Sequence, residues 1–126
     1  MHRAEVASIL LNFYSNSVKA MRRTAAARRI LIDGSRDTDD SIVIRFSDTG
    51  DGIPAENWES VFDLFFTTRV AASTEASTNE QVTGTGLGLW IVHQIATKAG
   101  GSVSVVDAPP GYVTCFEVRL PPEEEL

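Results

Sequence analysis

Hydrophobic and polar positions follow two different periods along this chain. Over 4–23 apolar residues recur every three or four positions, which predicts an amphipathic helix, and a second long helix is predicted over 87–98. The helix over 87–98 is apolar almost all round, so we expect it to be well buried. Strands are predicted at 29–33, 42–47, 102–106 and 112–120, and side chains of 42–47 and 112–120 alternate between two faces.

The connections between these elements differ in character. A polar turn over 34–40 joins the first two strands into a hairpin, and Pro54 starts a short helix. Gly100-Gly101 ends the second long helix, and Pro109-Pro110-Gly111 turns between the last two strands. Residues 70–83 are small and polar without a period, which fits either a flexible linker or a lid.

Length and composition narrow the class of protein. The 126 residues suffice for one domain, and 43% of them are hydrophobic. No run is apolar enough to cross a bilayer, and we expect no leader peptide. A net charge of −6 argues against a nucleic-acid-binding surface. The single cysteine, Cys115, is expected to be a packed residue in a reducing, cytoplasmic setting.

A polar stripe runs along the first helix beside its apolar face. Asn12 and Asn16 lie one turn apart within it, although Asn is a poor helix former. The stripe is either a solvated helix face or part of a binding site. Its members are Glu5, Ser8, Asn12, Asn16, Lys19 and Arg23.

Two glycine clusters suggest a nucleotide site. Asp48 ends the strand 42–47 and is followed by Gly50 and Gly52, which allow a sharp turn and close approach of a flat group. The second cluster, 84–88, opens the second long helix, where backbone N–H groups and the helix dipole favour phosphate. A carboxylate for a base edge and a cradle for phosphates together indicate a purine nucleotide.

Other glycine-rich motifs do not fit. The 84–88 cluster lacks the spacing of a dinucleotide fingerprint and the Gly-Lys-Ser/Thr of a P-loop. The stretch 48–52 has glycines where a calcium loop needs oxygen ligands. His2 and His93 are single histidines, and His93 is expected to be structural.

The order of these motifs resembles the ATP-binding domain of sensor histidine kinases, in the superfamily that includes gyrase, mismatch-repair ATPases and the heat-shock chaperone ATPase. The asparagine-bearing helix, Asp48-Thr49-Gly50-Asp51-Gly52-Ile53-Pro54, Phe62-Asp63-Leu64-Phe65-Phe66 and Gly84-Thr85-Gly86-Leu87-Gly88 come in the family's order. The resemblance implies a two-layer α/β sandwich, with a mixed, mostly antiparallel sheet covered by helices and an ATP lid.

The resemblance also implies roles for individual residues. Asn16 would hold Mg²⁺, Asn12 would lie near the phosphates, and Lys19 would contact phosphate. Asp48 would accept a hydrogen bond from the adenine amino group. The remaining residues that the resemblance places at ATP are Gly50, Gly52, Ile53, Phe62, Phe65, Arg69, Thr83, Gly84, Thr85, Gly86, Leu87 and Gly88.

Departures from the family pattern shape the expected function. We expect 1–120 to be an ATP-binding catalytic domain, either trimmed or a minimal relative, and 121–126 to be an acidic tail. It would lack the family's phospho-accepting helical domain and the strands that usually precede the asparagine-bearing segment, here 11–19. Asn12 stands where gyrase-like relatives have a Glu that activates water, which favours a kinase. Within the phenylalanine-rich motif over 62–66, Leu64 stands where the family commonly has a proline, which is a minor difference.

The resemblance thus predicts a monomeric, cytoplasmic domain that binds ATP and Mg²⁺ and phosphorylates a histidine on a helical domain, in cis or in trans. A response regulator would act downstream, and neither nucleic acid nor membrane would be contacted. The alternatives are a nucleotide-gated interaction module and a serine kinase of the anti-sigma type.

Overall fold

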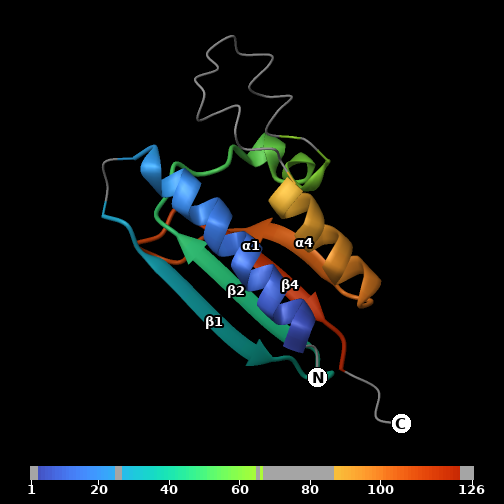
Figure 1. The fold of residues 1–126 in the computed structure, drawn as a ribbon. Helices are drawn as coiled ribbons and strands as arrows, with labels where there is room; N and C mark the ends of the chain where they lie inside the picture. Colours follow the sequence, from blue (N-terminus) through green and yellow to red (C-terminus); the bar gives the residue numbers. More distant parts are fainter. Residues whose placement is uncertain (1–2, 25–26, 65, 67–86, 123–126) are drawn as a thin grey trace.

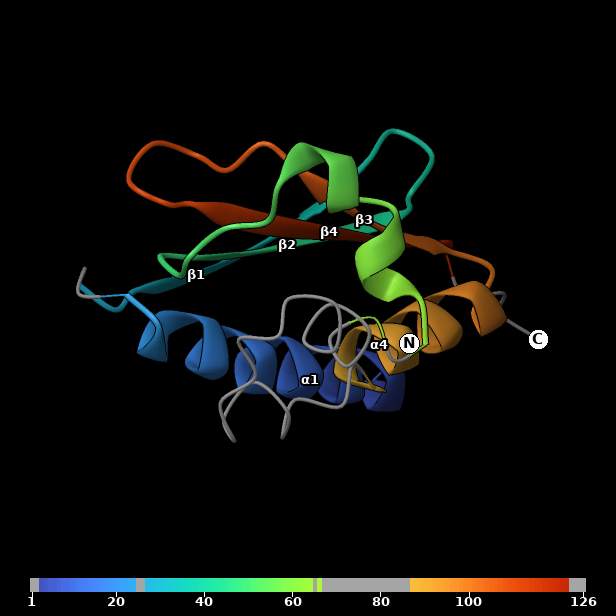
Figure 2. The same cartoon turned by 90° about the horizontal axis from the view of Figure 1, so that it is seen from above.

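Two α-helices lie side by side on one face of a four-stranded sheet (Figures 1 and 2). The computed structural model describes residues 3–24, 27–64, 66 and 87–122. The helices are α1 (Arg3–Arg22) and α4 (Leu87–Lys98). The strands are β1 (Ile30–Arg36), β2 (Ile42–Asp48), β3 (Ser102–Val106) and β4 (Thr114–Leu120). This arrangement confirms the predicted two-layer α/β sandwich.

The sheet has the order β1-β2-β4-β3. Every pair of neighbouring strands in the described part of the chain is antiparallel. The central pair, β2 and β4, sets Phe46 opposite Phe116 and Asp48 opposite Thr114. Asp48 therefore lies at the end of a central strand and not on an edge strand.

Aromatic side chains join the two layers. The ring of Phe13 on α1 stacks on Phe116 of β4 with centroids 4.9 Å apart, and it lies 5.4 Å from Phe46 of β2. All three are fully buried, and each is worth about 1.5–3 kcal/mol relative to an exposed side chain. Phe13 thus locks the polar stripe of α1 in position over the sheet.

Strand β1 is longer than predicted. The polar residues 34–36, expected to turn, continue the ladder, with Gly34 opposite Ile44 and Arg36 opposite Ile42. Backbone hydrogen bonds to the seven-residue β2 extend β1, and because β1 is an exposed edge its side chains need not be apolar.

The short helix predicted after Pro54 is instead two 3₁₀ turns, η1 (Ala55–Asn57) and η2 (Ser60–Phe62). The Trp58 indole N–H between them donates to the carbonyl of Ile53 at 3.0 Å, and Asp63 leaves η2 in an extended conformation. The segment therefore forms short 3₁₀ turns instead of the continuous backbone hydrogen bonds of an α-helix.

Helix α4 is less buried than its sequence predicted. Only Val92 and Ala96 are fully buried, while Trp90 and Ile91 are half-buried and His93 is exposed. The reason is that the described sheet covers one face of α4 and α1 flanks another. The predicted stop is confirmed: Gly100 has φ +84° and the Gly101 N–H donates to the carbonyl of Ala96 at 2.8 Å.

Two predicted segments, the loop 70–83 and most of the acidic tail (123–126), lie outside the described residues. Within the described residues no helix has the length and hydropathy needed to cross a bilayer. Cys115 is 1% exposed, as expected for a packed residue, and burial raises the pKa of its thiol.

Candidate functional site

Asp48 is a buried carboxylate at the end of β2. The Ser17 hydroxyl of α1 donates to its Oδ2 at 2.6 Å, and the Gly50 N–H donates to its Oδ1 at 2.9 Å. The side chain is only 1% exposed. Each carboxylate oxygen has a further lone pair, so Asp48 can still accept a hydrogen bond from a donor on a ligand.

The backbone around Asp48 is held from two sides. The Val113 N–H donates to the Asp48 carbonyl at 2.8 Å. The Thr49 hydroxyl donates to the carbonyl of Ala27 at 2.6 Å and accepts from the Arg29 N–H at 2.9 Å. The carboxylate is therefore presented by a rigid strand end.

The two glycines after Asp48 have distinct structural reasons. A Cβ on Gly50 would lie 2.7 Å from Cβ of Ala20, so the loop touches α1 without room for a side chain. Gly52 has φ +81°, a conformation that glycine adopts at little cost. On the same loop, Asp51 forms an ion pair with Arg23 at 2.6 Å, which ties the loop to the end of α1.

The asparagine stripe of α1 faces the start of α4. The side-chain amide of Asn12 donates to the carbonyl of Ser8 at 2.7 Å. Its Oδ1 would lie 3.6 Å from a Cβ on Gly88, the second residue of α4. Asn16 follows one turn later and is half-buried, and Lys19 is exposed. The stripe is therefore partly covered by the start of α4 and is not solvated throughout.

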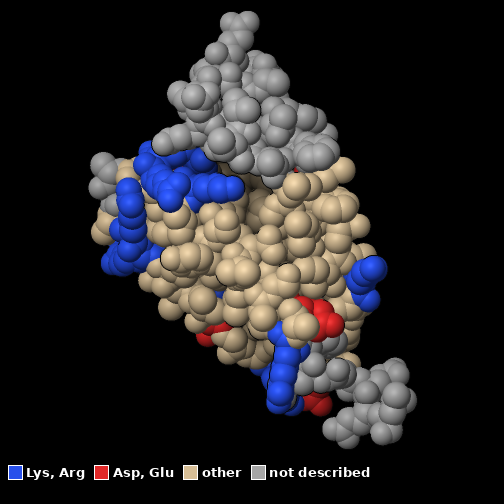
Figure 3. Space-filling model, in the orientation of Figure 1, with Lys and Arg blue, Asp and Glu red and all other residues tan. Residues whose placement is uncertain are grey.

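The local charge at this end of the molecule favours anions. The last turn of α1 carries Lys19 and Arg22, and Figure 3 shows basic side chains gathered over that end of α1 beside a hollow in the surface. The positive end of the α4 dipole adds to this field. A protein with net charge −6 thus has a basic region next to the asparagine stripe.

The other predicted site residues are placed as follows. Leu87 and Gly88 form the first turn of α4, and Ile53 is partly buried against the core. Phe62 is 6% exposed and packs its ring on Phe116 at 6.2 Å, so it is a core residue. The predicted residues outside the described part of the chain are Phe65, Arg69, Thr83, Gly84, Thr85 and Gly86.

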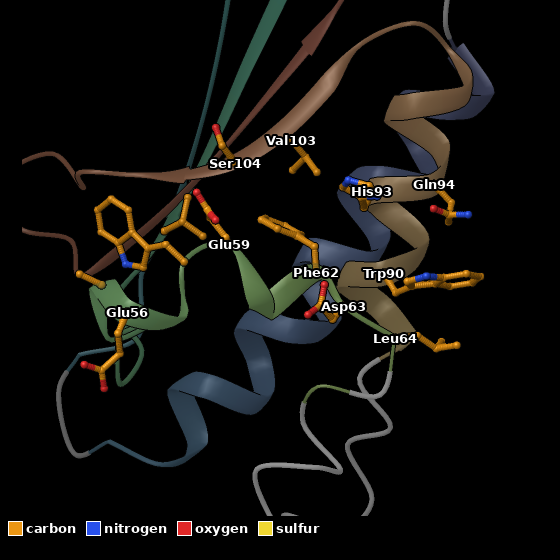
Figure 4. Close-up of a pocket in the computed structure, with 13 residues that line it drawn as sticks. Glu56, Glu59, Phe62, Asp63, Leu64, Trp90, His93, Gln94, Val103 and Ser104 are labelled. Carbon is orange, nitrogen blue, oxygen red and sulfur yellow. The ribbon is translucent and has the colours of Figure 1, made fainter.

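A separate pocket of about 690 Å³ lies between the 3₁₀ turns, α4 and β3 (Figure 4). Its described lining includes Phe62, the exposed His93 and the acidic Glu56, Glu59 and Asp63, and none of it comes from α1 or β2. Three carboxylates would repel a polyphosphate. The described lining of this pocket does not include Asp48, Asn12 or Asn16.

Sequence reasoning missed the contacts made by Ser17, Thr49 and Arg23. Ser17 was the findable one, because it is a hydroxyl residue on the otherwise apolar face of α1 and a buried hydroxyl needs a partner. The Thr49 and Arg23 contacts join positions 20 to 28 residues apart. Their partners depend on tertiary structure that no local pattern encodes.

The sequence profile of the histidine kinase-, DNA gyrase B- and HSP90-like ATPases matches residues 1–124. The chain belongs to this ATPase family. The family and fold that the motifs predicted are thus confirmed, and the chain is the histidine-kinase type of ATPase domain found in sensor kinases.

Curated relatives of this ATPase domain are sensor histidine kinases. It is 35% identical over 113 residues to sensor histidine kinase RcsC of Escherichia coli (strain K12), covering 90% of this chain and 11% of RcsC. It is 30% identical over 113 residues to ZraS of Salmonella typhi, covering 90% of this chain and 21% of ZraS. The chain thus spans about a tenth to a fifth of these relatives.

Solved structures give the same result for the fold. The mycobacterial sensor histidine kinase MprB aligns with a TM-score of 0.70 and 25% identity, covering 94% of this ATPase domain and 70% of the MprB chain. Full-length ShkA in complex with AMPPNP aligns with a TM-score of 0.69 and 27% identity. The alignment covers 93% of this ATPase domain and 21% of the ShkA chain.

Proposed function

We propose that this domain binds Mg·ATP and transfers its γ-phosphoryl group to a histidine on a separate helical domain. The single observation that carries the proposal is the buried Asp48 carboxylate, held by Ser17 and the Gly50 N–H beside the asparagine stripe. The family assignment and the AMPPNP bound to ShkA support adenine nucleotide as the ligand.

Asp48 would read the base. Its carboxylate is an acceptor, and adenine offers an exocyclic amino donor where guanine has a carbonyl oxygen. A hydrogen bond to a charged acceptor contributes about 1.5–3 kcal/mol, so this contact can separate ATP from GTP by roughly 10- to 100-fold. The phosphates would then extend along α1 toward the start of α4, where Asn12 and Gly88 meet.

The asparagine stripe fits a magnesium site that is shared with phosphate. Amide oxygens are hard ligands, and Mg²⁺ keeps several waters and phosphate oxygens, so one or two protein oxygens suffice. In the described part of the chain, no group of three or more His, Cys, Asp or Glu side chains is placed to hold a metal ion. Asn16 would hold the ion through Oδ1, and Mg²⁺ would neutralise phosphate charge when bound.

The transfer step needs positioning more than acid–base chemistry. A neutral imidazole nitrogen of the acceptor would form the N–P bond as the bond from γ-phosphorus to the β–γ bridging oxygen breaks, leaving ADP. Lys19 and the α4 N–H groups would offset the charge on the phosphates. Asn12 cannot take a proton from water, so it gives no route to hydrolysis.

The acceptor domain and a downstream response regulator are proposed partners. The chain spans only 11% of RcsC and 21% of ZraS, so membership of the ATPase family does not by itself establish these partners. We further propose that the domain acts as a cytoplasmic monomer that meets its acceptor in cis or in trans.

Radiolabelled γ-phosphate would test the proposal. The domain, fused to or mixed with a helical dimerisation domain bearing the acceptor histidine, should produce a phosphate bond that acid cleaves and alkali leaves intact. The same acceptor with its histidine replaced by Gln is the control. An acid-stable phosphoserine, or nucleotide binding without transfer, would contradict the proposed reaction and favour a serine kinase or a nucleotide-gated module.

A further inference from the structure

Ser17 is a polar residue on the buried face of α1. Its side chain is 0% exposed, and it lies in line with the apolar residues Ile9, Phe13 and Met21. A serine inside a helix usually bonds to the carbonyl four residues earlier or points to solvent. Here the hydroxyl instead donates across the layers to Asp48 Oδ2 at 2.6 Å.

The direction of this bond fixes what the pair can offer. An ionised carboxylate only accepts hydrogen bonds, so the Ser17 hydrogen must point to Asp48. The lone pairs of the Ser17 oxygen then face away from the carboxylate. The Gly50 N–H is engaged by Oδ1 at 2.9 Å, so it is not free to donate to a ligand either. As a result, Ser17 and Asp48 together present acceptors and no free donor.

We propose that Ser17 is a specificity-determining positioning residue that makes this end of the nucleotide site selective for a base with an exocyclic amino group. The inference rests on the proposed nucleotide function and deepens it. Ser17 holds the Asp48 carboxylate in one orientation and prevents the hydroxyl from serving as a donor to a carbonyl on the base.

Hypoxanthine is the informative competitor, because it replaces the adenine amino group with a carbonyl oxygen. That oxygen would face acceptors from both Asp48 and Ser17, and a favourable contact would require the Ser17 hydroxyl to abandon the carboxylate. Breaking a buried, charge-assisted hydrogen bond carries a large penalty. Without the hydroxyl, the carboxylate loses a fixed donor and can turn away from an incoming carbonyl.

The experiment is calorimetric titration of the whole chain and its Ser17→Ala variant with ATP and with inosine triphosphate at one Mg²⁺ concentration. The two ligands share their triphosphate, so the ratio of their affinities isolates the base. We expect Ser17→Ala to weaken ATP binding about 10-fold and to leave inosine triphosphate nearly unchanged, which lowers the ratio by about 10-fold. Ser15→Ala, at an exposed serine of the same helix, is the matched control and should keep the wild-type ratio.

The outcomes separate this inference from the proposed function. A wild-type chain that prefers ATP, with an unchanged ratio in Ser17→Ala, would overturn the role of Ser17 and leave the function standing. Equal losses for both ligands would assign Ser17 a structural role and also overturn it. A wild-type chain that binds neither ligand would overturn both proposals. If chemical denaturation shows that Ser17→Ala does not fold, Ser17→Cys keeps the bulk with a weak donor and must show the same fall in ratio.

Discussion

A methyl group on Gly50 would lie 2.7 Å from Cβ of Ala20, well inside van der Waals contact. The loop that follows Asp48 therefore touches α1 with no space for a side chain. Gly50→Ala should push the loop from the helix and disturb the N–H that donates to Asp48 Oδ1. We expect overpacking to lower the free energy of unfolding by about 1–3 kcal/mol, and we expect ATP affinity to fall as well. Urea denaturation and calorimetry measure the two effects.

Gly34→Ala is the control for this substitution. Nothing lies within 4 Å of a Cβ at Gly34, and its φ is not positive. Because alanine restricts the unfolded chain more than glycine does, we expect Gly34→Ala to be neutral or slightly stabilising. If Gly50→Ala were as stable as Gly34→Ala and bound ATP normally, the close contact between the loop and α1 would not be needed for stability or for ATP binding.

Asp48→Asn should remove most of the preference for adenine while the protein still folds. The amide keeps the size of the carboxylate but turns one acceptor into a donor, which would face the adenine amino group or compete with Ser17. We expect ATP affinity to fall about 10- to 100-fold. Asp107→Asn changes the same charge at an exposed position after β3 and should bind ATP like the wild type. Unchanged affinity in Asp48→Asn would refute its base-reading role.

Asn16→Ala tests the metal site. The amide oxygen is the proposed protein ligand of Mg²⁺, so its removal should weaken Mg·ATP much more than ATP measured with a chelator present. A loss of about 10-fold with Mg²⁺ and less than about 3-fold without it is expected for one ligand of a shared site. Equal losses under the two conditions would mean that Asn16 contacts the nucleotide or supports the fold, and that the ion is held elsewhere.

The ion pair between Asp37 and Arg119 predicts a pH effect on stability away from the site. The Arg119 guanidinium donates to Asp37 Oδ2 at 2.6 Å and is the main cause that holds the pKa of this carboxyl below 3.8. The folded state therefore binds this proton less readily than the unfolded state does. The contribution to stability is complete above pH 3.8 and is lost as pH falls through the lower folded pKa.

Asp37→Asn should therefore flatten the acid limb of the stability curve. Urea denaturation of wild type and variant across the acid range should show the two free energies of unfolding converging as pH falls below about 3.8. The effect is expected to be small because both side chains are solvent-exposed and screened. Parallel curves would show that the pair contributes nothing to folding.

Sequence periodicity predicted the helices and strands that bury one face against the core. Phe13 and Phe46 fall on apolar faces at helical and strand spacing, and both are in the core. Strand β1 was cut short because its continuation past Gly34 depends on hydrogen bonds to β2 and not on its own side chains. Helix α4 was judged too buried because apolar content does not tell which face a sheet will cover.

The site was predicted in outline and missed in detail. Asp48 stood out because a carboxylate at the end of a strand, followed at once by two glycines, is an unusual sequence pattern. The partner that holds it, Ser17, lies 31 positions away, so no local pattern pairs the two residues. The resemblance places Phe62 at ATP, and the structure adds that its ring packs in the core against Phe116. A family motif indicates which positions belong to a site, but the neighbours of each side chain depend on tertiary contacts that the motif does not contain.

The most direct measurement is calorimetric titration of this chain with ATP, ADP and GTP, each with and without Mg²⁺. We predict that ATP and ADP bind, that GTP binds at least about 10-fold more weakly, and that Mg²⁺ strengthens ATP binding. Equal affinity for ATP and GTP, or no binding of any nucleotide, would contradict the claim that Asp48 reads adenine at the end of β2.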